Sequence, residues 1–142
     1  MGLLDKLFGS TVNYPPLPAG NDALVKLDEV KAPLEELAHK VSDHLEVVPA
    51  EHEAFVFLGK PPEAFGIAWI HDGKVTSLKD MAKEHHLSAV QVGELIVQLG
   101  QAYQHASDAP RYSAEFGGKQ MVVIPSKGLG QEVHQIMANT LH

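Results

Sequence analysis

The sequence predicts a single α+β domain, and three observations indicate this class. Apolar residues recur at spacings of three and four from Asp22 to about Val47, two short apolar runs at 54–58 and 65–70 end in turn residues, and helical segments follow Ser77. With 142 residues, 44% of them apolar, the chain is long enough to bury one core without disulfides. It has no cysteine and no stretch of membrane-spanning length, so we expect a cytoplasmic protein.

A long amphipathic helix is expected over residues 22–47. Pro33 interrupts it, which predicts either a kink or a fresh helix with the proline in its first turn. The outward face is acidic, and the nearly heptad spacing leaves room for a partner helix. We therefore take Leu34, Leu37 and Val41 as candidates for helix pairing, with a homodimer as one outcome.

Short antiparallel strands are predicted in the central part of the chain. Asp72-Gly73 after `FGIAWIH` is a strong signal for a two-residue hairpin, and Gly117-Gly118 is a second such signal between `RYSAEF` and `KQMVVIP`. Trp69 is interpreted as a core residue. A closing helix is expected from about Leu129.

Two capped helices lie between these hairpins. Ser77 can cap a helix that starts at Leu78, and Ser88 can cap a second helix with Val92 and Leu95 facing inward. Residues 77–124, which include the second hairpin, resemble a winged helix-turn-helix. The chain departs from that family at His86, because the family usually places glycine in the turn. In DNA-binding members the outer face of the second helix enters the major groove, which here makes Gln91, Glu94 and Gln98 the candidate exposed residues.

The charge distribution argues against DNA as the partner. Residues 1–73 hold five lysines and twelve acidic residues, a net charge of −7, whereas residues 74–142 are balanced. Phosphate contacts supply most of the affinity for nucleic acid, and Arg111 is the single arginine. A non-catalytic protein-interaction or dimerisation module is thus the expected function. A DNA-binding transcriptional regulator is the first alternative.

The sequence carries no clear signature of catalysis, cofactor binding or metal binding. The nine histidines show no ligand spacing, since His39 and His44 stand five apart and miss a shared helix face. The `KGLGQE` stretch at 127–132 suggests phosphate binding but lacks the rest of a P-loop. No catalytic, cofactor-binding or metal residue is therefore predicted. A small enzyme whose site assembles from distant residues is the second alternative.

The start of the chain has its own pattern. Residues 1–21 are expected to be a flexible N-terminal segment and a proline-rich linker, ahead of a single domain at 22–142. A short helix over Met1 to Gly9 would place four apolar side chains on one side, which favours either an anchor to a membrane surface or a partner, or a loose turn that packs on the domain or frays. These side chains are Leu3, Leu4, Leu7 and Phe8.

Overall fold

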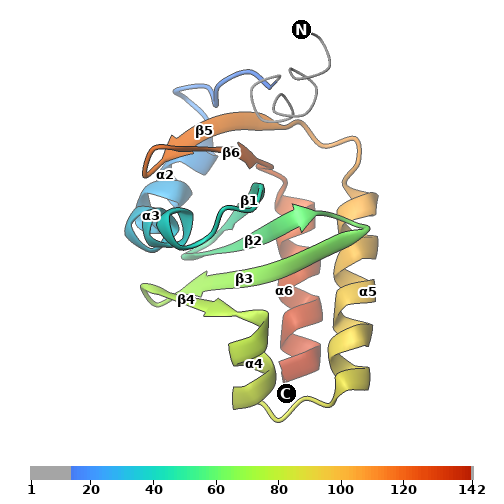
Figure 1. Ribbon diagram of the computed structural model, residues 1–142. Helices are drawn as coiled ribbons and strands as arrows, with labels where there is room; N and C mark the ends of the chain where they lie inside the picture. Colours follow the sequence, from blue (N-terminus) through green and yellow to red (C-terminus); the bar gives the residue numbers. More distant parts are fainter. Residues whose placement is uncertain (1–13, 142) are drawn as a thin grey trace, which may run out of the picture.

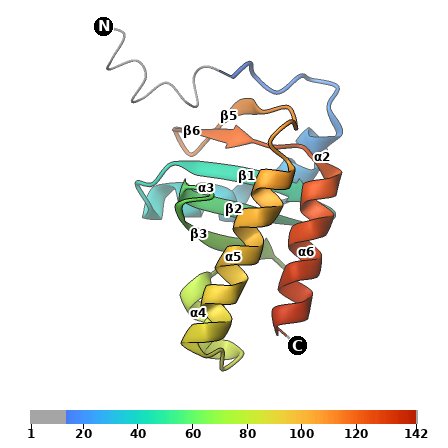
Figure 2. The same cartoon turned by 90° about the vertical axis from the view of Figure 1, so that its right-hand side faces the viewer.

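The computed structural model describes residues 14–141. In this part of the chain, five helices and one six-stranded sheet form three layers (Figure 1). Helices α2 (Asp22–Glu29) and α3 (Lys31–Lys40) cover one face of the sheet. The other face carries α4 (Leu78–Glu84), α5 (Ala89–His105) and α6 (Lys127–Leu141), of which α5 and α6 run side by side (Figure 2). The predicted mixture of α and β structure is confirmed.

The sheet joins all of the strands in the order β4-β3-β2-β1-β6-β5. Neighbouring strands are antiparallel except β1 and β6, which are parallel. Both faces are covered by helices, so successive residues of a strand enter two different cores, as Val56 and Phe57 of β2 do. The strands are β1 (Leu45–Ala50), β2 (Glu53–Lys60), β3 (Ala64–His71), β4 (Lys74–Ser77), β5 (Tyr112–Phe116) and β6 (Lys119–Val123).

Both predicted hairpins are present. Asp72 and Gly73 link β3 to β4 with φ values of 52° and 73°, and Gly117 and Gly118 link β5 to β6 with φ values of 59° and 81°. Positive φ at both central residues gives a turn whose twist matches that of the flanking strands. The hairpin expected as a wing thus exists, and it belongs to the same sheet as β1 to β4.

The two predicted helix caps are also confirmed. The Ser77 hydroxyl accepts a hydrogen bond from Asp80 N at 3.1 Å, and Ser88 forms a reciprocal capping box with Gln91. Between the helices, His86 adopts a φ of 54°. The turn therefore uses the left-handed conformation that glycine would adopt more easily.

The helix expected over residues 22–47 is two helices and the start of a strand: the alternative of a fresh helix with Pro33 in its first turn is confirmed, and the continuation of the helix to Val47 is wrong. Val30 caps the end of α2 and the start of α3. Pro33 lies in the first turn of α3, where backbone N–H groups have no partner within the helix, so the missing N–H of proline costs no hydrogen bond. The last part of the expected helix, residues 45–47, lies in strand β1 (Leu45–Ala50). Its residues Val47 and Val48 face opposite cores, so an extended strand buries both side chains.

Residues 14–21 were expected to be part of a flexible linker, and the structure places the first part of this stretch, residues 14–17, against β5. Leu17 N donates to Ser113 O at 3.2 Å, and Ser113 N donates to Pro15 O at 2.8 Å. Tyr14 and Leu17 pack against the two cores. The apolar residues predicted at the start of the chain, Leu3, Leu4, Leu7 and Phe8, lie outside the described residues.

Candidate functional site

The predicted site residues fall into two groups. Leu34 and Leu37 are 0% and 6% exposed and belong to the core between α3 and the sheet, and Val41 packs against that core. The expectation that these side chains meet a partner helix is therefore corrected, because folding of the domain itself buries them. The second group, Gln91, Glu94 and Gln98, is exposed on α5.

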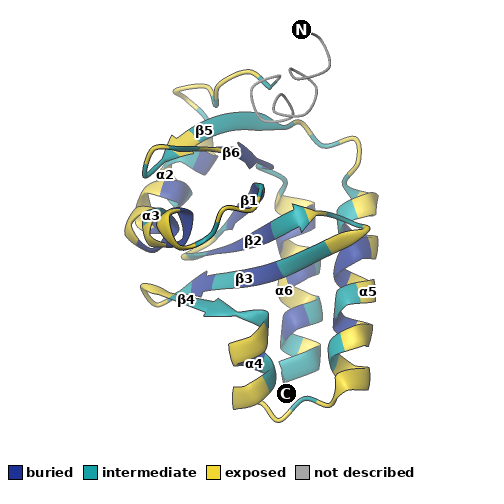
Figure 3. Cartoon of the chain, in the orientation of Figure 1, coloured by how far each residue is buried: buried dark blue, intermediate teal, exposed yellow. Residues whose placement is uncertain are grey.

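Helix α5 has a buried side and an exposed side (Figure 3). Leu95 and Leu99 pack into the core between α5, α6 and the sheet. On the opposite side, Val90 and Val97 are 70% and 60% exposed. Among the described residues, Val25 on α2 is the other large apolar side chain with this degree of exposure. Two of the three such side chains thus lie seven positions apart on one helix face.

A shallow groove of about 470 Å³ lies on this exposed side. We call it the α5 groove, and its lining residues are Val90, Gly93, Glu94, Val97 and Gln98. Two residues of the lining, Glu94 and Gln98, are candidates that the sequence indicated. The two valines were missed, because helical spacing alone did not separate them from the half-buried Val92 and the core residue Leu95.

Gly93 gives the α5 groove its depth. A Cβ added at this position would meet no atom within 4 Å, so no close approach requires glycine here. Gly100 of the same helix differs, because a Cβ there would lie 3.5 Å from Pro62 and 3.6 Å from Phe65. Glycine within a helix costs about 0.5–1 kcal/mol relative to alanine. Gly93 therefore lowers the surface between two valines at a cost to the helix.

The charge of the α5 groove is negative. Glu94 is the one ionised side chain in its lining, and α5 contains neither lysine nor arginine from Ala89 to His105. This surface therefore offers a carboxylate, amides and apolar area, and no cation for a phosphate group.

A carboxylate that the sequence analysis missed lies under the other end of α5. Glu46 of β1 is 8% exposed and accepts a hydrogen bond from the Tyr103 hydroxyl at 2.6 Å, while His44 Nε2 lies 3.0 Å from its second oxygen. Burial, followed by the hydrogen bond to Glu46, raises the pKa of Tyr103 to about 12. Arg111 stacks over the Tyr103 ring at 5.3 Å. The hydrogen bond between Tyr103 and Glu46 thus links α5 to β1, an inner strand of the sheet.

Glu53, the first residue of β2, forms a second cluster. One of its oxygens accepts a hydrogen bond from Trp69 Nε1 and the other lies near His134 Nδ1, each at 2.9 Å. Trp69 packs against the core and also stacks on His71 with ring centroids 3.8 Å apart. Trp69, predicted to be a core residue, is thus partly buried at the margin of the core, and its ring nitrogen is hydrogen-bonded. Within residues 14–141, no three histidine, cysteine or carboxylate side chains are placed to hold a metal ion.

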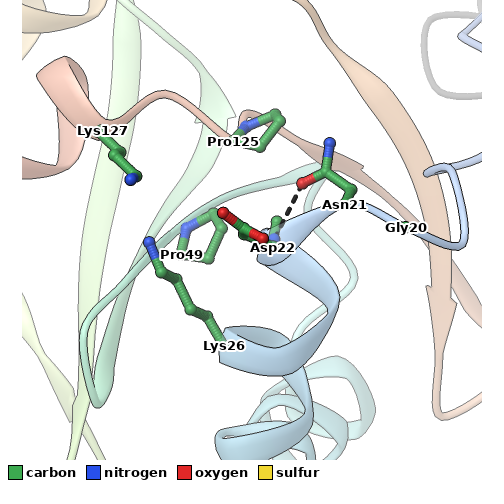
Figure 4. Close-up of a pocket in the computed structure, with 8 residues that line it drawn as sticks. Gly20, Asn21, Asp22, Lys26, Pro49, Pro125 and Lys127 are labelled. Carbon is green, nitrogen blue, oxygen red and sulfur yellow. Dashed lines mark hydrogen bonds between the residues drawn. The ribbon is translucent and has the colours of Figure 1, made fainter.

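A second hollow of about 270 Å³ separates the start of α2 from the start of α6 (Figure 4). Lys26 and Lys127 reach into it, and the Asp22 carboxylate faces the same space. The `KGLGQE` stretch supplies Lys127, and the Ser126 hydroxyl caps α6 by accepting from Leu129 N at 3.1 Å. The lining is of mixed charge and contains no histidine, serine or threonine.

Comparisons with known proteins do not assign the chain to a class. No family model, no curated protein and no solved structure matches it. None of the helices in the described part is long and apolar enough to cross a membrane.

Proposed function

We propose that this protein is a protein-interaction module and that its α5 groove binds an apolar segment of a partner. The observation that carries the proposal is the pair of exposed valines, Val90 and Val97, on either side of a glycine that packing does not require. Exposed apolar side chains grouped around a depression are typical of a docking surface. Glu94 and Gln98 at the rim supply hydrogen-bond acceptors and donors that set the orientation of the bound segment.

The size of the α5 groove indicates weak, reversible binding. Full burial of a valine side chain contributes about 1.5–3 kcal/mol. Val90 and Val97 are 70% and 60% exposed, so covering both contributes about 2–4 kcal/mol. Association itself costs about 4 kcal/mol or more. An obligate homodimer buries at least about 2,000 Å², so the groove alone is too small for one.

DNA binding through a winged helix-turn-helix is the alternative function. It would place α5 in the major groove with Gln91 and Gln98 toward base edges. The preceding helix α4 carries Lys79 and Lys83, whereas α5 itself has no lysine or arginine. We favour protein binding because phosphate contacts supply the affinity that positions such a helix. Catalysis is not part of the proposal, because the clusters at Glu46 and Glu53 line neither hollow.

A peptide titration of the full chain tests the proposal. The probe is a synthetic amphipathic helical peptide of leucine, alanine and lysine, and the readout is the set of amide chemical shifts. We expect the shifts to change along residues 90–98 and Val97→Glu to abolish binding. Val25→Glu is the matched control, since Val25 is equally exposed on the opposite layer, and it should bind as the native chain does.

Two results would overturn the proposal. One is a set of shift changes that avoids α5, and the other is equal loss of binding in the Val25→Glu and Val97→Glu variants. Filter binding of duplex DNA at low salt addresses the alternative directly. Retention that falls steeply with added salt would favour the regulator, and no retention at low salt would exclude it.

A further inference from the structure

The hollow between the starts of α2 and α6, here called the α2–α6 hollow, lies where the two parallel strands of the sheet part (Figure 4). Strands β1 and β6 pair in register as far as Val47 and Val123, and Ile124 N donates to Val47 O at 2.8 Å just beyond. In open sheets covered by helices, ligands bind in the crevice outside the carboxyl ends of the strands. The α2–α6 hollow shares no lining residue with the α5 groove, so its chemistry is independent of the proposed function.

Two prolines stop the strands from pairing further. Val47 presents its carbonyl to β6, and backbone groups alternate in direction along a strand, so Pro49 faces the same side. Proline has no N–H, which is why it rarely occurs in an inner strand such as β1. Pro125, which follows Ile124, also lacks this donor, and both prolines line the hollow. The opening between the strands is therefore specified by two residues of the chain.

Two lysines reach into the α2–α6 hollow from opposite layers of the fold. Lys26 belongs to α2, Lys127 is the first residue of α6, and both side chains are directed into the space beside Pro49 (Figure 4). Within residues 14–141, every ion pair within 4.0 Å involves a histidine, so neither lysine is paired with a carboxylate there. Two ammonium groups that share one space repel each other, and an anion between them would relieve the repulsion.

Asp22 limits which anions fit. Its carboxylate faces the same space, four residues before Lys26 on α2. A carboxylate repels a second anion but accepts a hydrogen bond from a hydroxyl group. The volume of about 270 Å³ lies below the range of roughly 300–1,000 Å³ found for drug-sized ligands, which indicates a small molecule. Phosphate suits a pair of lysines, because its three acceptor oxygens can receive hydrogen bonds from two separate donors.

We propose that the α2–α6 hollow binds a small phosphomonoester that also carries a hydroxyl group. The phosphate lies between Lys26 and Lys127, which donate to different oxygens, and the ligand's hydroxyl group donates to Asp22. The `KGLGQE` stretch thus contributes to phosphate binding through Lys127, without the rest of a P-loop. Loss of one hydrogen bond between an ammonium group and the phosphate should weaken binding about tenfold.

Titration of the full chain with glycerol phosphate, followed by amide chemical shifts, tests this site. We expect the shifts to change at residues 20–26 and 125–128. Lys26→Gln and Lys127→Gln should each weaken binding about tenfold, and the double variant should show no binding. Lys79→Gln/Lys83→Gln is the matched control, because it removes the same charge from two exposed lysines of α4. It should bind as the native chain does.

Inorganic phosphate is the second probe, and it separates the phosphate from the rest of the ligand. The native chain should bind glycerol phosphate more tightly, since only this probe brings a hydroxyl group to Asp22. Asp22→Asn removes a negative charge from the hollow, so it should tighten the binding of inorganic phosphate and narrow the difference between the two probes. This increase in affinity on loss of a carboxylate distinguishes a built site from general attraction to lysines.

Four results would overturn the proposal. The first is a set of shift changes that avoids both segments, and the second is equal weakening in the Lys79→Gln/Lys83→Gln control. The third is equal affinity of the native chain for glycerol phosphate and inorganic phosphate, which would mean a site for free phosphate. The fourth is equal affinity for acetate, which would mean a site for any small anion. Peptide binding in the α5 groove should be unchanged in Lys26→Gln/Lys127→Gln, so failure of one proposal leaves the other standing.

Discussion

Replacement of Gly93 by alanine links the stability of this protein to its proposed function. The added Cβ meets no atom within 4 Å, so it introduces no clash. Gly93 is the fifth residue of a seventeen-residue helix, where glycine costs about 0.5–1 kcal/mol relative to alanine. Gly93→Ala should therefore raise the free energy of unfolding by that amount.

The same methyl group projects into the α5 groove. It makes the depression between Val90 and Val97 shallower, and Gly93→Leu fills it further. We expect peptide affinity to fall in the order glycine, alanine, leucine while stability does not fall. An improvement in stability that reduces binding is the pattern expected of a residue kept for function.

Urea unfolding followed by circular dichroism measures the first effect, and the peptide titration measures the second. Gly59→Ala is the opposing control, because Gly59 has a φ of 102° and its Cβ would lie 2.9 Å from the Ala64 carbonyl oxygen. That variant should lose at least about 1 kcal/mol. A Gly93→Ala variant that is less stable than the native chain, or that binds peptide unchanged, would refute the reasoning.

Further predictions concern the core, the caps and the cluster at Glu46. Tyr103→Phe removes the hydrogen bond to this buried carboxylate and should cost about 1–3 kcal/mol in urea unfolding, and an effect below that range would show that the bond contributes little. Because the pKa of Tyr103 is raised to about 12, its contribution to stability is complete below pH 10 and is lost as pH rises toward 12. Tyrosinate absorbance gained near pH 12 should be missing in Tyr103→Phe. Leu34→Ala should destabilise by about 2–5 kcal/mol and Val25→Ala by far less, since Leu34 is 0% and Val25 69% exposed. Ser88→Ala should cost about 1 kcal/mol by thermal or urea unfolding, as the loss of a capping box does.

Features set by a few neighbouring residues were predictable from the sequence. The turns at Asp72-Gly73 and Gly117-Gly118 and the caps at Ser77 and Ser88 depend on local backbone conformation and local hydrogen bonds. The exposure of Gln91, Glu94 and Gln98 followed from helical spacing once α5 was located. The exposure of these three side chains was therefore predictable, because the ends of their helix are marked by local signals.

Contacts between distant residues required the tertiary structure. Helical spacing was predicted to continue to about Val47, and the pairing of the segment with β2 and β6 makes it part of strand β1. The same packing buries Leu34 and Leu37, which spacing alone allowed to face a partner. Glu46 and Tyr103 are 57 residues apart in sequence, and no local pattern joins them.

The sequence by itself thus determined the class of mixed α and β structure, the hairpins, the capped helices and the acidic, cation-poor character of the exposed face of α5. The tertiary structure decided which apolar side chains remain uncovered. Val90 and Val97 resemble the core valines in sequence, and they differ because the sheet and α6 occupy only one side of α5. Burial is a property of the assembled layers, so the exposure of these two valines could be recognised only when those layers were in place.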